Sequence, residues 1–224
     1  MTIRKVPLVT GETYHVFNRS IARQPIFLST YDYQRALDVL IFYSYFNPPL
    51  RFSHYKRLSK SQENDFMKSL RKNNEKQVEI LAFCLMPNHF HFLLKEIRER
   101  GISTFMSNFQ NSYAKYFNLR KDRNGSLFQT MFKAVRIETD EQLIHVARYI
   151  HLNPITAYIL KDIKGLTTYP WSSFPIYVGK PIADIVNTKT LLGYFYSKDK
   201  FITFTKDQIS YQRELNKIKH LVLE

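Results

Sequence analysis

The sequence predicts an α+β protein in which helices cover a central antiparallel β-sheet, followed by a C-terminal extension. Apolar runs of strand type alternate with stretches of helical spacing in the order β-α-ββ-α-β-α, and neither repeats nor low-complexity tracts interrupt that order. The chain has 224 residues, of which 44% are hydrophobic, enough for one sizeable core. We therefore expect one domain over residues 10–156, with residues 157–224 packed on or beside it.

The residue pattern in the first part of the chain predicts a strand, a helix and an insertion. Residues 14–19 are typical of a strand, and a turn at Pro25 separates them from residues 30–46, where apolar side chains recur at helical spacing. Residues 51–76 are polar and basic, with only Phe66 and Leu70 in a helix-like stripe. We interpret this stretch as a surface insertion with a short helix.

The second part begins with two apolar runs, residues 78–86 and 89–95, separated by the turn-like pair Pro87-Asn88. We expect this hairpin to form the centre of the sheet. A helix over about residues 102–119 and a strand over residues 132–138 follow. Thr139 then precedes two acids, a pattern typical of a capped helix start. From about residue 157 the chain is aromatic and rich in turn residues, and it ends in a charged helical tail.

The charge of the chain favours a polyanionic partner. There are 33 Lys and Arg residues against 19 Asp and Glu, a formal net charge of +14, so nucleic acid is the leading candidate. No apolar run reaches the ~18 residues of a membrane helix, and the start resembles no signal peptide, so we expect a cytoplasmic protein without a membrane partner. The single cysteine, Cys84, excludes a disulfide or a multi-thiolate metal site within one chain.

Two histidines are candidates for metal binding. Side chains alternate along a strand, so the imidazoles of His89 and His91 share one face of the predicted strand while Phe90 and Phe92 share the other. Imidazoles suit divalent metals, and two of them leave positions open for a substrate oxygen. The plain alternative is two ordinary histidines on a half-exposed strand, because short motifs occur often by chance.

A tyrosine and an amide are the next candidates. Tyr149 and Asn153 are four residues apart on the last predicted helix of the domain, so their side chains lie on one helical face. Asn153 precedes Pro154, however, which favours a position at the helix end. With 15 tyrosines in the chain, a packing role for Tyr149 is the alternative.

Taken together and in order, these segments resemble the single-tyrosine HUH transposases and their REP-associated relatives. The resemblance extends from about residue 10 to residue 180. It is carried by YHVFNR (14–19), CLMPNHFHFLL (84–94), GSLFQ (125–129) with FKA (132–134), and RYIHLNP (148–154).

The resemblance implies a fold, a chemistry and a partner. The fold is that of HUH endonucleases, a sandwich of the ferredoxin-like or RRM-like kind, with the histidines on a middle strand. His89, His91 and Asn153 would bind Mg²⁺ or Mn²⁺, and Tyr149 would be the nucleophile that nicks single-stranded DNA and forms a 5′-phosphotyrosine during transposition. The implied partner is single-stranded DNA with hairpin ends, and a homodimer is an alternative to the monomer.

A set of cations flanks these candidates in sequence and is expected to hold DNA phosphates. The set comprises Arg19, Arg120, Lys121, Arg123, Lys133, Arg136 and Arg148. Arg148 is also a candidate for favouring the phenolate of Tyr149. His145 and His151 are candidates for proton handling, with surface or packing positions as the alternative.

Two other functions fit parts of the pattern. A domesticated repeat-processing or DNA-binding protein on the same scaffold would keep the basic surface without transposing DNA. A metal-independent RNA-binding protein would account for charge and aromatics but not for the histidine pair.

Overall fold

The computed structural model describes residues 7–73, 75–180, 185–211 and 213. The strands are β1 (Thr13–Arg19), β2 (Val78–Met86), β3 (His89–Glu96) and β4 (Lys133–Arg136). The helices are the 3-10 turn η1 (Ile21–Arg23), α1 (Thr30–Tyr43), α2 (Phe52–Tyr55), α3 (Lys60–Asn73), α4 (Gly101–Arg120), α5 (Asp140–Thr156), α6 (Ile163–Leu166), α7 (Phe174–Tyr177), α8 (Thr188–Leu192) and α9 (Lys198–Lys206). The predicted tail beyond residue 213 lies outside the described residues.

The four strands form one antiparallel sheet in the order β2-β3-β1-β4. The predicted α+β class with a central antiparallel sheet is therefore confirmed. The expectation that the whole β2-β3 hairpin lies at the centre is wrong for β2, which is an edge strand. β2 is nevertheless buried on nearly all of its length, and burial on both faces gave it the apolar composition of a central strand.

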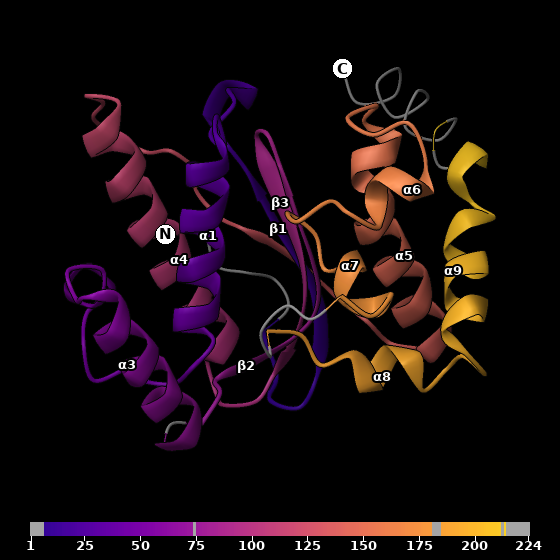
Figure 1. The fold of residues 1–224 in the computed structure, drawn as a ribbon, viewed down its shortest axis with the longest axis horizontal. Helices are drawn as coiled ribbons and strands as arrows, with labels where there is room; N and C mark the ends of the chain where they lie inside the picture. Colours follow the sequence, from indigo (N-terminus) through magenta and orange to yellow (C-terminus); the bar gives the residue numbers. More distant parts are fainter. Residues whose placement is uncertain (1–6, 74, 181–184, 212, 214–224) are drawn as a thin grey trace.

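Helices cover the two faces of the sheet (Figure 1), with α1, α3 and α4 on one side and α5 to α9 on the other. The alternation of β3 divides its side chains between these layers. Phe90 and Phe92 belong to the core cluster that contains side chains of α1 and α4. Leu93, on the face of the histidines, belongs to the cluster built with α5 and the C-terminal helices. The histidine pair therefore faces α5.

The outer edge of β2 is covered by the chain that follows α6. Backbone N–H groups of Leu85, Ser173 and Asn187 donate to the carbonyl oxygens of Trp171, Phe83 and Ile80 at 2.8, 2.9 and 2.9 Å, respectively. These bonds satisfy edge groups of β2 that water would otherwise have to satisfy. Residues after 156 thus add both hydrogen bonds and core side chains to the sheet.

Residues 51–76 contain more helix than the sequence analysis predicted, because α3 alone has 14 residues. Phe66 stacks on Phe42 of α1, with ring centroids 5.9 Å apart, and Lys56 forms ion pairs with Asp38 and Glu63 at 3.3 and 2.7 Å. The high charge of the segment made its packing face difficult to recognise in the sequence, because that face consists of only a few apolar residues. The predicted short helix is therefore wrong in its length, because α3 has 14 residues and packs on α1, while most residues of the segment are exposed at the surface as expected.

The helix α5 begins as predicted, since the hydroxyl of Thr139 accepts a hydrogen bond from the backbone N–H of Gln142 at 3.1 Å. It continues through Pro154 to Thr156, so Asn153 lies inside the helix and not at its end. The proline removes one backbone donor, but the next turn forms, with the N–H of Ala157 donating to the carbonyl of Asn153 at 2.9 Å. Asn153 therefore keeps its helical spacing from Tyr149. Within the described ranges, no helix is both long and apolar enough to cross a membrane.

Candidate active site

The two histidines of β3 lie side by side on the sheet face under α5. His91 is opposite Phe17 and His89 is opposite Arg19 in the register with β1. The imidazole centroids of His89 and His91 are 5.1 Å apart, with ring planes nearly perpendicular. Strand alternation thus produces the shared face that the sequence predicted.

Hydrogen bonds determine which ring nitrogen of His89 carries a proton and which carries the lone pair. Its Nδ1 is 2.6 Å from Oδ1 of Asn88, and Nδ2 of Asn88 donates to the carbonyl oxygen of Arg23 at 2.9 Å. Because that bond orients the amide with Oδ1 towards the ring, Nδ1 of His89 carries a proton. Burial, and next the charge of Arg19, lower the pKa of His89 to about 4. The ring is therefore neutral near pH 7, and the lone pair is on Nε2.

A third histidine, His15 of β1, contacts the pair. Its Nε2 is 2.9 Å from Nδ1 of His91, and the two rings stack with centroids 5.1 Å apart. This contact leaves Nε2 of His91 as the ring nitrogen suited to a metal. His15 was not among the site residues predicted from the sequence. His15 pairs with Leu93 in the register of β1 with β3, and Leu93 is two residues from His91, so His15 and His91 share one face of the sheet. The sequence alone does not reveal this register.

Tyr149 of α5 lies over these histidines. Its ring centroid is 5.5 Å from that of His91 and 5.9 Å from that of His15, with both contacts edge-on. Burial raises the pKa of the Tyr149 phenol, while a hydrogen bond with the Asn153 side chain and the charge of Arg19 act in the opposite direction. The cation that favours the phenolate is thus Arg19.

Asn153 lies one turn after Tyr149 and is buried. Its Nδ2 donates to the backbone carbonyl oxygen of Tyr149 at 2.8 Å. This bond fixes the amide against α5, and Oδ1 is the atom of this side chain that a divalent cation prefers. The structure therefore holds the Asn153 amide beside Tyr149, one helical turn further along α5.

The donor atoms fit a divalent metal of open coordination. Both imidazoles of β3 have Nε2 as the nitrogen for a ligand bond, and the amide oxygen of Asn153 is a hard donor of the kind Mg²⁺ and Mn²⁺ accept. Among the described residues, no three or more His, Cys, Asp or Glu side chains converge on one point. A metal held here would therefore depend on the amide and on oxygens from water or substrate.

Arg148 is placed differently from what the sequence suggested. Its guanidinium lies 4.1 Å from the ring centroid of Phe204, donates to the carbonyl oxygen of Phe204 at 3.2 Å and is 2.6 Å from Nδ1 of His145. The side chain is buried, and successive helical residues point 100° apart, so Arg148 faces α9 while Tyr149 faces the sheet. This position suits neither DNA binding nor stabilisation of the phenolate. His145 is on the same side, against Phe204.

Of the other predicted DNA-binding cations, Arg19 ends β1, Lys133 and Arg136 lie on β4, and Arg120, Lys121 and Arg123 lie at or just after the end of α4. Lys121 and Lys133 are exposed, and Arg123 is half-buried. Arg136 pairs with Glu12 at 2.7 Å. Arg120 pairs with the buried Asp32 at 2.9 Å and donates to the hydroxyl of Tyr116 at 2.6 Å, so it links α4 to α1.

His151 is a buried packing residue. Its Nε2 is 2.8 Å from the hydroxyl of Ser173, and Oγ of Ser173 accepts from the backbone N–H of Phe83 at 2.9 Å. This network joins α5 to β2 through the extension. Burial lowers the pKa of His151 to about 3, so the folded protein holds it neutral and away from proton transfer at Tyr149.

A pH dependence of stability follows from His151. The unfolded histidine takes up a proton below about pH 6.5 whereas the folded one does not, so its contribution is complete above that pH and decreases as the pH falls towards 3. Urea unfolding at pH 7 and pH 4.5 should show the wild type losing on the order of 2 kcal/mol more than His151→Gln, whose amide keeps a hydrogen bond to Ser173. An equal loss in both proteins would contradict the neutral buried state.

Comparisons with known proteins bear on this arrangement. Residues 53–153 match the model of the family described as "Transposase IS200 like", a range that contains His89, His91, Tyr149 and Asn153. No curated protein matches the chain.

Two solved structures are similar. A REP-associated tyrosine transposase bound to a REP hairpin is 18% identical with a TM-score of 0.53, over 84% of this chain and 94% of that chain. A candidate transposase from Deinococcus radiodurans is 13% identical with a TM-score of 0.37, over 66% of this chain and 95% of that chain. The first similarity shows a shared fold, and with the family match it confirms the resemblance predicted from the sequence.

Proposed function

Because residues 53–153 match the IS200-like transposases and the fold is that of a REP-associated tyrosine transposase, we propose that this protein cuts and rejoins single-stranded DNA with hairpin ends. Tyr149 is the nucleophile, and His89, His91 and Asn153 hold a divalent metal, Mg²⁺ or Mn²⁺. The reaction is a transesterification that serves DNA transposition.

One observation carries the proposal: the ring of Tyr149 lies against His91 and His15. Of the 15 tyrosines in the chain, this one combines a half-buried phenol, two imidazole contacts from the sheet and an amide one turn later. A packing tyrosine needs apolar neighbours only. The polar surroundings of Tyr149 support a chemical role.

The metal, when bound, would withdraw charge from a non-bridging phosphate oxygen and so stabilise the pentacoordinate transition state. The chain contributes positioning. Asn88 and His15 fix the rings of His89 and His91, and the neutral state of His89 keeps its lone pair available. A hydrogen bond to the backbone carbonyl oxygen of Tyr149 orients the side-chain amide of Asn153. These contacts orient the ligands before substrate arrives.

Tyr149 attacks phosphorus in line, and the bond to the 3′-oxygen breaks. The phenol loses its proton, the departing 3′-oxygen gains one, and the products are a 5′-phosphotyrosine and a 3′-OH. Burial opposes formation of the phenolate, and Arg19 favours it. The new bond is again a phosphodiester, so attack by another 3′-OH rejoins DNA without ATP.

The sheet face beside the site carries partly or fully exposed side chains that a strand of DNA would contact. Residues of β1 on the histidine face, including Phe17 and Arg19, are half-buried, and Lys133 and Val135 of β4, which pair with Phe17 and His15, are exposed. With a net charge of +14 on the chain, this face suits a phosphate backbone that approaches Tyr149.

A covalent adduct tests the proposed function. The purified full chain, incubated with a hairpin-bearing single-stranded oligonucleotide labelled at its 3′ end and with Mg²⁺ or Mn²⁺, should yield a labelled protein band that survives denaturing electrophoresis. The label stays on the 3′ fragment because the tyrosine captures the 5′ phosphate. EDTA should abolish the band. A band that persists in EDTA would contradict the metal dependence, and cleavage without any protein-linked label would contradict the tyrosine intermediate.

A further inference from the structure

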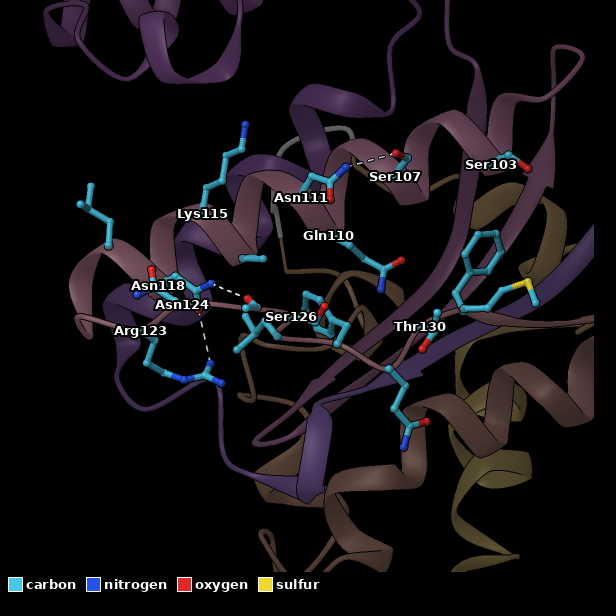
Figure 2. Close-up of a pocket in the computed structure, with 18 residues that line it drawn as sticks. Ser103, Ser107, Gln110, Asn111, Lys115, Asn118, Arg123, Asn124, Ser126 and Thr130 are labelled. Carbon is cyan, nitrogen blue, oxygen red and sulfur yellow. Dashed lines mark hydrogen bonds between the residues drawn. The ribbon is translucent and has the colours of Figure 1, made fainter. Parts of the chain in front are cut away.

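A groove of about 880 Å³ lies between α4 and the loop that joins α4 to β4 (Figure 2). Its polar lining consists of amides and hydroxyls besides two cations; the amides are Gln110, Asn111, Asn118, Asn124 and Gln129, and the hydroxyls are Ser103, Ser107, Ser126 and Thr130. Two cations, Lys115 and Arg123, also line it. Among the described residues that line the groove, no side chain is acidic. The groove therefore offers neutral hydrogen-bonding groups and positive charge.

The chemistry of this groove differs from that of an ordinary solvated helix face. α3 has six charged residues of both signs in 14 positions, which is typical of a helix that faces water. α4 has only Lys115 and Arg120 in 20 positions and no acid. Its groove side instead repeats Ser103, Ser107 and Asn111 at four-residue spacing. Amides and hydroxyls in this position are suited to a ligand with many donors and acceptors.

Apolar side chains accompany the amides. Phe128 is buried beneath the groove, and the half-buried Phe132 and the exposed Met131 also line it. Leu119, likewise in the lining, is 88% exposed. Flat aromatic ligands such as nucleobases combine apolar faces with polar edges, and this lining matches both properties.

The groove is connected to the candidate active site through the end of β1. The backbone N–H of Gln129 donates to the carbonyl oxygen of Arg19 at 2.9 Å, and Nδ2 of Asn18 donates to the carbonyl oxygen of Gln129 at 3.0 Å. Arg19 is opposite His89 in the sheet. Gln129 is therefore next to Arg19, and a strand that passes Tyr149 and Arg19 would enter the groove by rounding the end of β1 towards α4, which lies on the other face of the sheet.

We propose that this groove binds unpaired nucleotides of the single DNA strand that continues from the cleaved phosphodiester. The amides contact base edges, as Asn and Gln side chains do in other nucleic-acid complexes, and Lys115 and Arg123 contact phosphates. The inference rests on the proposed function, because that function brings single-stranded DNA to Arg19.

Binding measured without cleavage tests the groove. Fluorescence anisotropy of a labelled, mixed-sequence, unpaired DNA oligonucleotide in EDTA should show about tenfold weaker binding for Gln110→Ala/Asn111→Ala than for the wild type. Asn111 is exposed and Gln110 is half-buried on α4, and alanine favours helix, so the fold should persist in circular dichroism. The matched control is Gln34→Ala/Asn73→Ala, which removes two exposed helical amides outside the groove and should bind like the wild type.

A second variant separates phosphate contacts from base contacts. Lys115→Ala should reduce the slope of log K against log salt by about 0.7, the value for one phosphate contact on a single strand, whereas the amide variant should leave that slope unchanged. Binding of a blunt DNA duplex should not change in the amide variant.

The groove assignment and the proposed function can fail separately. Three results would overturn the groove assignment, whatever the adduct assay shows. The amide variant could bind DNA as tightly as the wild type, it could lose affinity equally for duplex and single strand, or the protein could bind an RNA of the same sequence more tightly than the DNA. A tenfold loss by the amide variant, together with a wild type that forms no adduct, would retain the groove and overturn the proposed chemistry.

Discussion

Tyr149→Phe is expected to form no covalent DNA adduct above background, while it binds the oligonucleotide as well as the wild type does. The substitution removes only the phenolic oxygen that attacks phosphorus and keeps the ring against His91 and His15. Loss of a nucleophile typically costs several powers of ten in rate. Denaturing electrophoresis of 3′-labelled substrate measures the adduct, and anisotropy in EDTA measures binding.

The control is Tyr196→Phe, because Tyr196 is fully exposed and its hydroxyl can be removed without disturbing the core. This variant should form the adduct at the wild-type rate. Thermal unfolding should place Tyr149→Phe within about 1 kcal/mol of the wild type, since one half-buried hydroxyl is lost. An undiminished adduct in Tyr149→Phe would remove Tyr149 from the mechanism and direct the search to another tyrosine.

His89→Ala and His91→Ala should lose metal-dependent cleavage by on the order of 10³-fold while salt-sensitive DNA binding persists. Each substitution removes an imidazole whose Nε2 the hydrogen-bond network directs to the site. Titration of Mn²⁺, followed by electron paramagnetic resonance in the absence of DNA, should show weaker metal binding in both variants. This readout does not depend on turnover.

His54→Ala is the matched control, because His54 lies exposed on α2. It should bind Mn²⁺ and cleave like the wild type. His15→Ala should give an intermediate result, about 10- to 100-fold weaker metal binding, because His15 orients His91 and does not itself supply a ligand. Unchanged Mn²⁺ binding in His89→Ala and His91→Ala would show that the pair has a structural role only.

Local patterns in the sequence were sufficient to predict the parts of the fold and site that depend on neighbouring residues. The alternation of β3 placed His89 and His91 on one face, and the cap at Thr139 marked the start of α5. Tyr149 and Asn153 meet because both lie on one helix, four residues apart. These relations need only the periods of strand and helix.

Other features depended on contacts between distant segments. His15 joins the site only through the pairing of β1 with β3, and Arg148 is buried only because α9 returns to cover α5. The edge position of β2 was hidden because the extension buries it like a central strand. No local period contains such information, so these residues could be placed only by the tertiary structure.

Because the chain after α6 covers the outer edge of β2, the two edges of the sheet differ in how readily a strand of another copy can pair with them. In the part of the chain that the structure describes, the other edge strand of the sheet is β4, which has only four residues and carries the exposed Lys133, whose charge would repel the same strand of another copy. A chain shortened before Trp171 would instead present β2, a nine-residue apolar strand with open hydrogen-bonding groups. Such edges promote aggregation. The extension therefore keeps the edge of β2 from pairing with other chains as well as completing the core.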